Sequence, residues 1–207
     1  MKKIAVIVAL EREYELVGKA LAGRPDISLS LCGIGKVNAA VGATEVILRD
    51  RPDAIISSGV AGAIDASLKP MDVIVASRVA YHDVWCGPPN EFGVVQGYPH
   101  FFEAGKELYD KAMSLSVEGV AIKGGLQISG DRFIVAEDIP ALHRLYPEAL
   151  SVDMESGALA QTCHRFGIPF ISFRILSDSA DEGSYTDFWT KAPENSFRVL
   201  KSFLETL

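Results

Sequence analysis

Residues 151–167, SVDMESGALAQTCHRFG, contain the passage from a buried strand to a helix that sets the fold class of this chain. The apolar end of a strand, residues 149–152, runs directly into an Asp-Met-Glu triplet at 153–155, and a helix of small residues begins at once. Gly167 is placed to end that helix, and Pro169 prevents its continuation. The sequence therefore predicts a strand-helix unit, and it raises the question of why two acids and a methionine occupy its junction.

The same alternation of strand and helix patterns continues in both directions from this unit. Residues 4–8 are a continuous apolar run, which is typical of a strand buried on both faces. The chain shows no repeat, low-complexity tract or linker, so we expect one α/β domain over residues 1–207. The predicted strands are 4–8, 27–31, 54–57, 72–79, 126–128, 149–154 and 170–176, and the predicted helices are 13–22, 37–48, 102–115, 139–145, 156–166 and 193–206.

Composition and charge exclude several classes of protein. The chain has 207 residues, 48% of them apolar, which is enough for an α/β domain with a substantial core. Its net charge is -7 with no block of Lys or Arg, which argues against nucleic acid or a membrane surface as a partner. No apolar run approaches the ~20 residues needed to span a bilayer. The three cysteines lack CxxC spacing, which favours a reduced, cytoplasmic setting over a disulfide frame or zinc site.

Carboxylates and glycine-rich segments follow the predicted strands, at the edge where ligands bind in open α/β sheets. Glu13 follows the first strand, and residues 58–62, SGVAG, form an expected turn after the third. Glu155 follows the sixth strand and Asp178 follows the last. The four histidines are scattered and form no metal-binding pattern, so we expect neither a metal nor a cofactor.

Each carboxylate also has a purely structural explanation. Glu13 and Glu155 fall in the first turns of helices, where an acid suits the helix dipole, and Asp178 could cap whatever follows it. The GIGK segment lacks the GxxxxGK[ST] spacing of a P-loop, so it does not predict a nucleoside triphosphate site. Three carboxylates at three strand ends are harder to explain together, because paired carboxylates are what glycosidic cleavage requires.

Seven motifs resemble, in their order along the chain, the nucleoside phosphorylase/hydrolase superfamily and within it the 5′-methylthioadenosine/S-adenosylhomocysteine nucleosidase family. The resemblance implies a single-domain three-layer α/β sandwich with a central mixed, mostly parallel twisted sheet flanked by helices. It also implies hydrolysis of the N-glycosidic bond of methylthioadenosine and S-adenosylhomocysteine, with 5′-deoxyadenosine as a further candidate, to adenine and the 5′-substituted ribose. The motifs are ALERE (9–13), CGIGKVNAA (32–40), SSGVAGAID (57–65), AYHD (80–83), ISGDRFI (128–134), VDMES (152–156) and RILSDSAD (174–181).

The resemblance implies a role for each carboxylate. Glu13 resembles the base that deprotonates the attacking water, and Asp178 the acid that protonates purine N7 so that adenine can leave. Glu155 resembles the acceptor for the ribose 2′- and 3′-hydroxyls, and its charge favours a cationic sugar. Met154 would lie against the ribose as an apolar wall, and Phe133 would stack on adenine. The resemblance places the other substrate contacts at Leu10, Ile34, Val60, Ala61, Gly62, Ile134, Ser177 and Phe188.

Some positions depart from the family or stay open. Asp153 matches no catalytic position, whereas Arg174 and Ser177 are expected to hold Asp178 and its loop. Position 60 is Val where some members carry a serine, which removes one polar contact near the ribose. The chain is short before the GIGK segment, so we expect the family's strand there to be reduced.

The resemblance further implies a homodimer in which residues 83–101 reach the neighbouring subunit and help to form the pocket for the 5′ substituent. Three alternatives stay open at this point: a purine nucleoside phosphorylase, a futalosine hydrolase-like nucleosidase, and a non-catalytic nucleoside-binding protein. The two acids of ALERE lie near the expected phosphate position, where they would repel phosphate and suit water. In every case the expected partner is a small purine nucleoside.

Overall fold

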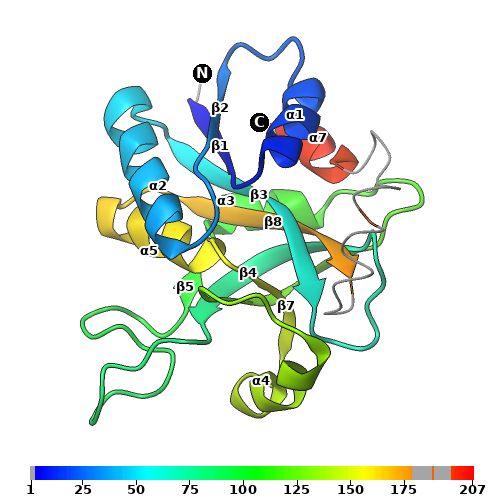
Figure 1. Ribbon diagram of the computed structural model, residues 1–207. Coiled ribbons are helices and arrows are strands. Elements are labelled where there is room, and N and C mark those ends of the chain that lie inside the picture. The colour runs from blue at the N-terminus through cyan, green and yellow to red at the C-terminus, as the bar shows by residue number, and fades with distance from the viewer. Residues whose placement is uncertain (1–2, 179–187, 189–196) are drawn as a thin grey trace.

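The computed structural model describes residues 3–178, 188 and 197–207, with the backbone alone at Asp178 (Figure 1). A mixed sheet runs through the molecule and helices flank it, as predicted. The strands are β1 (Ile4–Val8), β2 (Ile27–Leu31), β3 (Ala54–Ala63), β4 (Val73–Tyr81), β5 (Phe102–Glu103), β6 (Ile122–Ser129), β7 (Ala149–Asp153) and β8 (Phe170–Asp178). The helices are α1 (Glu11–Ala20), α2 (Lys36–Asp50), α3 (Lys106–Met113), α4 (Ile139–Leu145), α5 (Ser156–Phe166) and α7 (Arg198–Leu204), with a short 3-10 turn, η1 (Ala136–Asp138).

The side chains of β1 show why the molecule has three layers. Ile4, Val6 and Val8 pack into a core that also holds residues of α1, α3 and α7. Ala5 and Ile7 point to the opposite face, into a core shared with α2 and α5 (Figure 1). Because successive strand residues alternate between faces, a strand covered on both sides must be apolar throughout.

The strand order creates a gap in the sheet. The order is β2-β1-β3-β7-β6-β4-β5, and β8 pairs with both β3 and β4, so that the five strands β3, β8, β4, β6 and β7 pair in a closed circuit. β3 runs parallel to β1 as far as Ser57, then pairs antiparallel with β7 at Gly62 and Ala63. Between these pairings β3 has no partner on that side among the described strands, and the ends of β1 and β7 diverge there. Such a point, where neighbouring strands part, is where α/β sheets bind ligands.

The prediction of a turn at residues 58–62 is wrong, because this segment continues β3. Small residues are typical of turns, but here they allow neighbouring groups to approach the strand closely. A Cβ atom on Gly59 would lie 2.6 Å from the Glu13 Oε1 atom, so any larger residue there would displace that carboxylate. A bulge at Ala61 and Gly62 then shifts the register with β8.

The predicted helix at residues 102–115 is wrong at its start. Phe102 and Glu103 form β5, which pairs with β4, and α3 begins only at Lys106. Phe102 is buried edge-on against Tyr81, so tertiary packing decides its conformation. At the other side of the sheet, β2 is a full five-residue edge strand beside β1, although the chain before GIGK is short.

The remaining elements follow the predicted pattern with shifted ends. Helix α5 matches its predicted bounds, and Gly167 closes it in the left-handed conformation, φ 69°. The final helix is described as α7, while part of the predicted range 193–206 lies outside the described residues. None of the helices in the described ranges is long and apolar enough to cross a membrane. The connection between β4 and β5, residues 82–101, extends away from the sheet (Figure 1).

Candidate active site

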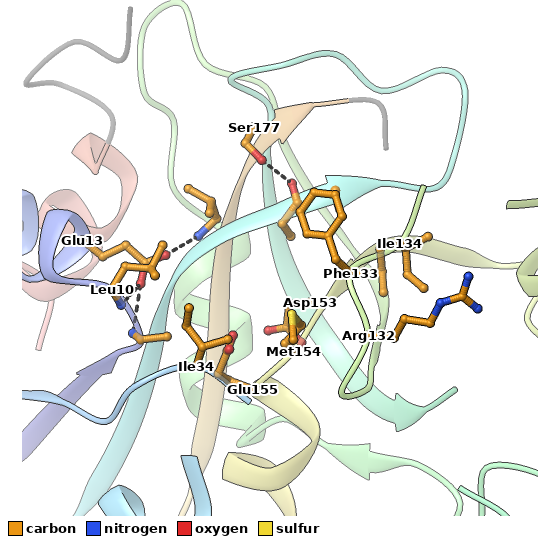
Figure 2. A pocket seen from close by; sticks show the side chains of 15 residues that line it. Leu10, Glu13, Ile34, Arg132, Phe133, Ile134, Asp153, Met154, Glu155 and Ser177 are labelled. Atoms are coloured by element: carbon orange, nitrogen blue, oxygen red, sulfur yellow. Dashed lines mark hydrogen bonds between the residues drawn. The ribbon is translucent and has the colours of Figure 1, made fainter. Parts of the chain in front are cut away.

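A pocket lies where β1 and β7 part along β3. Its volume is about 180 Å³, and it draws on the C-terminal ends of β1, β3, β6, β7 and β8 or the residues just after them, on α1 and on the segment before α2. Figure 2 shows Leu10 and Glu13 on one side of it, Phe133 and Ile134 on the other, and Met154 between them in this view. The lining residues are Ala9, Leu10, Glu13, Ile34, Val60, Ala61, Gly62, Arg132, Phe133, Ile134, Val152, Asp153, Met154, Glu155 and Ser177.

Glu13 is fixed by backbone donors from two strand regions. Its Oε2 atom accepts hydrogen bonds from the amides of Ala9 (2.9 Å) and Leu10 (3.0 Å), and its Oε1 atom accepts one from Val60 (3.0 Å). Burial raises the pKa of Glu13 above its ordinary value of 4.5, and Arg174 and the three amide donors only partly offset this. A buried carboxylate with a raised pKa suits a general base, because its proton affinity moves towards that needed near neutral pH.

Glu155 faces the pocket from the start of α5 and lies near Ile34 (Figure 2). Its side chain is buried, and the amide of Gly35 donates a hydrogen bond of 2.9 Å to its Oε1 atom. Burial raises the pKa of Glu155 to about 7, and the negative charge of Asp153 adds to the rise. Arg174 and the Gly35 amide act in the opposite direction. Donor groups of a ligand would therefore favour the charged form of Glu155.

Asp153 has a different environment from Glu155, although only one residue separates them. Its carboxylate forms an ion pair with Arg174 at 2.7 Å, and both side chains are almost completely buried. It also accepts hydrogen bonds from the amide (3.1 and 3.2 Å) and the hydroxyl (2.6 Å) of Ser156 at the start of α5. Asp153 thus neutralises a buried cation and supports the first turn of a helix.

The Asp153–Arg174 pair belongs to a larger buried charge network. Arg174 donates to the hydroxyls of Ser57 (2.8 Å) and Ser156 (2.9 Å). The Ser156 hydroxyl also receives a hydrogen bond from Gln127, whose amide oxygen accepts one from Ser172. Burial alone would lower the pKa of Arg174, but nearby carboxylates, Asp153 foremost, outweigh it and raise that pKa. We use "buried charge network" for these six residues, Ser57, Gln127, Asp153, Ser156, Ser172 and Arg174.

The structure brings most of the predicted site residues together but not all of them. Ser177 lines the pocket and donates to the carbonyl of Ala61 at 3.3 Å. The backbone of Asp178 ends β8 opposite Gly62, and its side chain lies outside the described atoms. Phe188 is buried in the core beneath α1 and α7 and is not among the described pocket-lining residues. Residues 179–191 contain small polar residues followed by aromatic ones, a pattern that predicts a lid over the ligand, and apart from Phe188 they lie outside the described residues.

Sequence reasoning missed four pocket-lining residues: Ala9, Arg132, Val152 and Asp153. Arg132 forms an ion pair with Asp138 at 2.7 Å, so its charge is partly neutralised beside the pocket. Arg174 pairs with Asp153 among the described side chains, and its expected contact with Asp178 lies outside them. An arginine within the apolar run of β8 was a signal that an acid must lie nearby, because a buried arginine needs a counter-charge, but it does not identify which acid.

No metal site is found in the part of the chain that the structure describes: no group of three or more His, Cys, Asp or Glu side chains there could hold an ion. The described lining of the pocket presents carboxylates, backbone amides and apolar side chains. It offers a buried base, a second carboxylate that can accept hydroxyl donors, and an apolar wall with an aromatic ring.

Comparison with known proteins places these features in a family. The sequence profile of the phosphorylase superfamily matches residues 12–205. The 5′-methylthioadenosine/S-adenosylhomocysteine nucleosidase of Halalkalibacterium halodurans is 36% identical over 230 residues, covering all of both chains. The structure of the Neisseria meningitidis nucleosidase of the same name, in complex with methylthio-immucillin-A, superposes with a TM-score of 0.93 at 34% identity, again over all of both chains.

A structure with a different printed activity also superposes well. Futalosine hydrolase of Helicobacter pylori strain 26695 gives a TM-score of 0.91 at 27% identity, covering 100% of this chain and 98% of that one. The fold therefore accommodates more than one nucleoside substrate.

Proposed function

The chain belongs to the phosphorylase superfamily and, within it, to the 5′-methylthioadenosine/S-adenosylhomocysteine nucleosidases, and from this premise we propose how its pocket cleaves a purine nucleoside with water. The enzyme is an N-glycosyl hydrolase. Its substrates are 5′-methylthioadenosine and S-adenosylhomocysteine, and its products are adenine and the 5′-substituted ribose.

One observation carries the choice of water over phosphate. The amides of Ala9, Leu10 and Val60 converge where an oxyanion would bind, but all three donate to the carboxylate of Glu13. Phosphate would meet a fixed carboxylate instead of free donors, and the two charges would repel each other. A water molecule beside Glu13 gains a base, so the same geometry that opposes phosphorolysis supports hydrolysis.

The sugar and the base are held by different walls of the pocket. Glu155 accepts the ribose 2′- and 3′-hydroxyls and, as a carboxylate, stabilises the positive charge that develops on the sugar. Met154 covers the ribose and Phe133 stacks on adenine, with the backbone of Ile134 at its edge. Leu10, Ile34, Val60, Ala61, Gly62 and Ser177 complete the contacts, and Phe188 is proposed to approach the nucleoside from the segment after β8.

The direct test is adenine release in buffer free of phosphate. Purified protein should release adenine from methylthioadenosine without phosphate, and added phosphate should not increase the rate. Futalosine supplied at the same concentration serves as the competing substrate. A requirement for phosphate together with a ribose-1-phosphate product would overturn the proposal, and faster turnover of futalosine would change the substrate class.

We assign Asp178 as the acid that protonates purine N7. The Asp178→Asn variant cannot supply a proton at neutral pH, so hydrolysis of methylthioadenosine should fall by ~10² or more. A ribosyl substrate with a nitrophenolate leaving group needs little protonation, and its hydrolysis should fall far less. Equal losses on both substrates would mean that Asp178 shapes the site without donating the proton.

The active form is proposed to be a homodimer. Val37, Val41 and Leu48 are 74%, 53% and 67% exposed and lie along the outer side of α2, while Trp85 and Phe92 are exposed on the segment between β4 and β5. Apolar side chains gathered on a surface are typical of an interface. Light scattering at assay concentration should show a dimer, and a fully active monomer would refute this assembly.

We propose that residues 1–207 act as a single catalytic domain in the cytoplasm. The pocket draws on β1, β3, β6, β7 and β8, strands that span the chain from its first to its last, which supports one folded unit. The cysteines at positions 32, 86 and 163 are all free thiols, which is compatible with a reducing compartment. Partial proteolysis that yields an active fragment would contradict the single-domain assignment.

A further inference from the structure

Helix α2 starts without a cap of its own. Its N-cap residue is Gly35, with φ 88°, and glycine has no side chain to accept the first amides of the helix. Two carboxylates from distant segments take that role: Glu155 accepts the amide of Gly35 at 2.9 Å, and Asp131 accepts the amide of Lys36 at 2.7 Å. The start of α2 is therefore held by the loop after β6 and by the pocket residue Glu155.

The carboxylate of Asp131 is itself held in a closed circuit of three residues. The amide of Asp131 donates to Asp83 Oδ2 at 2.8 Å, and Lys36 Nζ lies 2.9 Å from both oxygens of Asp83. Lys36 thus contacts Asp131 through its backbone and Asp83 through its side chain. These residues come from the GIGK, ISGD and AYHD motifs, and the proposed reaction uses none of the three.

Two glycines allow the three segments to approach so closely. A Cβ atom on Gly130 would lie 2.6 Å from the imidazole ring of His82 and 2.7 Å from Asp83 Cγ. A Cβ atom on Gly35 would lie 3.0 Å from Asp131 Oδ1. The side chains of His82, Asp83 and Asp131 therefore occupy the space that a side chain at Gly130 or Gly35 would need.

Both nucleoside-facing walls of the pocket are attached to this circuit. Ile34 and the donor to Glu155, Gly35, directly precede Lys36. Phe133, on the opposite wall, follows Asp131 by two residues and faces the same cavity (Figure 2). A displacement of either segment would change the distance between the sugar side and the base side.

We infer that Lys36, Asp83 and Asp131 are positioning residues for nucleoside binding, because their circuit fixes the distance between the Glu155 wall and the Phe133 wall. This inference rests on the proposed function, in which Glu155 holds the ribose and Phe133 holds the base. The circuit's side chains are partly exposed, 24% for Lys36 and 26% for Asp83, so their ion pair contributes little to global stability. Its effect is on geometry.

The first experiment separates binding from folding. Lys36→Met removes the cation but keeps the length of the side chain, and we expect KM for methylthioadenosine to rise about tenfold with kcat reduced less than about threefold. Glu13 lies on α1 and keeps its backbone donors, so the chemical step should be largely spared. Lys36→Arg keeps the charge and should restore KM to within about twofold of wild type.

The control variant is Lys106→Met, which breaks an ion pair with Asp110 of 2.6 Å on α3, far along the chain from the pocket segments. It should leave KM and kcat unchanged. A purely structural role for Lys36 would lower the folded, active fraction, and hence the maximal rate, at unchanged KM. Lys36→Met with wild-type KM overturns the inference.

A double-mutant cycle tests whether the residues act as one unit. Asp83→Asn should raise KM as Lys36→Met does, and the double variant should be no more than about twofold worse than the poorer single variant. Residues that share one interaction give such non-additive effects. Two tenfold rises in KM that multiply to about a hundredfold in the double variant would mean that the residues act independently, and would overturn the inference.

Amide hydrogen exchange provides a readout that does not need turnover. In a peptide covering residues 33–38, exchange at the start of α2 should accelerate about tenfold in Asp131→Ala but not in Asp131→Asn, whose side-chain oxygen can still cap the helix. Unchanged exchange in Asp131→Ala overturns the inference, as does faster exchange without weaker binding of a non-hydrolysable methylthioadenosine analogue, which spans both walls. If the wild-type protein releases no adenine from methylthioadenosine, the proposed reaction fails, and exchange together with binding of the analogue still decides the inference.

Discussion

Asp153 and Glu155 are two acids at one strand-helix junction, yet the molecule uses them in opposite ways. Asp153 is held by Arg174 and by two groups of Ser156, inside a network whose members satisfy one another. Glu155 accepts one hydrogen bond, from Gly35, among the described residues, and its other oxygen stays available at the pocket. The chain thus places a carboxylate whose partners all come from the protein next to a carboxylate that needs ligand groups for its remaining hydrogen bonds.

The difference answers why acids occupy a buried strand end. A fully paired buried charge is expensive to disturb and holds one arrangement of strands. A partly paired carboxylate costs stability in the empty protein, but it gains hydrogen bonds when substrate hydroxyls arrive. On this view, removing a pocket carboxylate should cost activity, whereas removing a network carboxylate should cost stability.

The largest expected effect is on catalysis, at Glu13. Glu13→Gln keeps the shape but removes the base, and we expect turnover of methylthioadenosine to fall by about 10²–10⁴. The thermal midpoint should stay within about 4 °C of wild type, as measured by calorimetry, because the side chain keeps one acceptor oxygen. A Glu13→Gln variant that loses stability but retains turnover would mean that Glu13 serves stability, as a network carboxylate does, and not catalysis.

The next effect is on stability, at Asp153. Asp153→Asn leaves Arg174 buried without its counter-charge, and the free energy of unfolding should fall by about 3 kcal/mol in urea titration. The matched control is Asp26→Asn, which breaks a partly exposed ion pair of 2.8 Å with Arg24 and should lower the free energy of unfolding far less. Equal losses in the free energy of unfolding would show that the buried charge network stabilises the protein no more than a partly exposed ion pair does.

A stability gain is expected at Glu155, and it depends on pH. The pKa of Glu155 is raised from 4.5 to about 7, so the native protein binds more protons than the unfolded chain between these values. Stability therefore falls as pH rises through this window, by up to about 3 kcal/mol. Glutamine does not ionise, so Glu155→Gln avoids this loss of stability. The variant should be roughly 2–3 kcal/mol more stable than wild type at pH 8.

The same variant should lose that advantage by about pH 5, where Glu155 is already protonated in the native protein. Urea unfolding at pH 5 and pH 8 measures both differences. A Glu155→Gln variant that is less stable than wild type at pH 8 would mean that Glu155 is as well satisfied as Asp153, and the comparison between the two acids would fail.

The smallest expected effect sharpens the comparison by moving Glu13 without removing it. In Gly59→Ala the new Cβ atom would lie 2.6 Å from Glu13 Oε1 and displace the base, so kcat should fall about tenfold. Gly18→Ala on α1 is the control, since its Cβ atom meets Leu29 at an ordinary 3.7 Å. Steady-state kinetics of the two variants should differ, and equal kcat values would show that Glu13 tolerates displacement.

Much of the fold could be predicted from the sequence because its signals are local. The apolar run of β1 and the glycine that closes α5 depend on residues within a few positions of each other. The predictions are wrong where residues far apart in the sequence decide the backbone conformation. Residues 58–62 are extended because β8 and Glu13 pack against them, and Phe102 joins a strand because β4 lies beside it.

The candidate site shows the same division. Glu13, Glu155 and Phe133 lie in one pocket as the strand-end argument and the resemblance predict. The ion pair of Asp153 with Arg174 could not be found, because the two residues are 21 positions apart and their strands are not adjacent in the sheet order. Asp178 and Phe188 keep their predicted roles as proposals, since the lining of the described pocket includes neither.

The start of α2 is capped by Glu155, a residue far along the chain, and this has a consequence for the synthesis of the protein. Glu155 follows Gly35 by 120 residues, so a ribosome working at about 5–20 residues per second completes the first turn of α2 roughly 6–24 s after that turn emerges. We expect ribosome-stalled chains that end before residue 155 to leave this turn open to amide exchange, and longer chains to protect it. Competence to bind nucleosides should therefore arise late and in one step during synthesis, and not gradually as each strand joins the sheet.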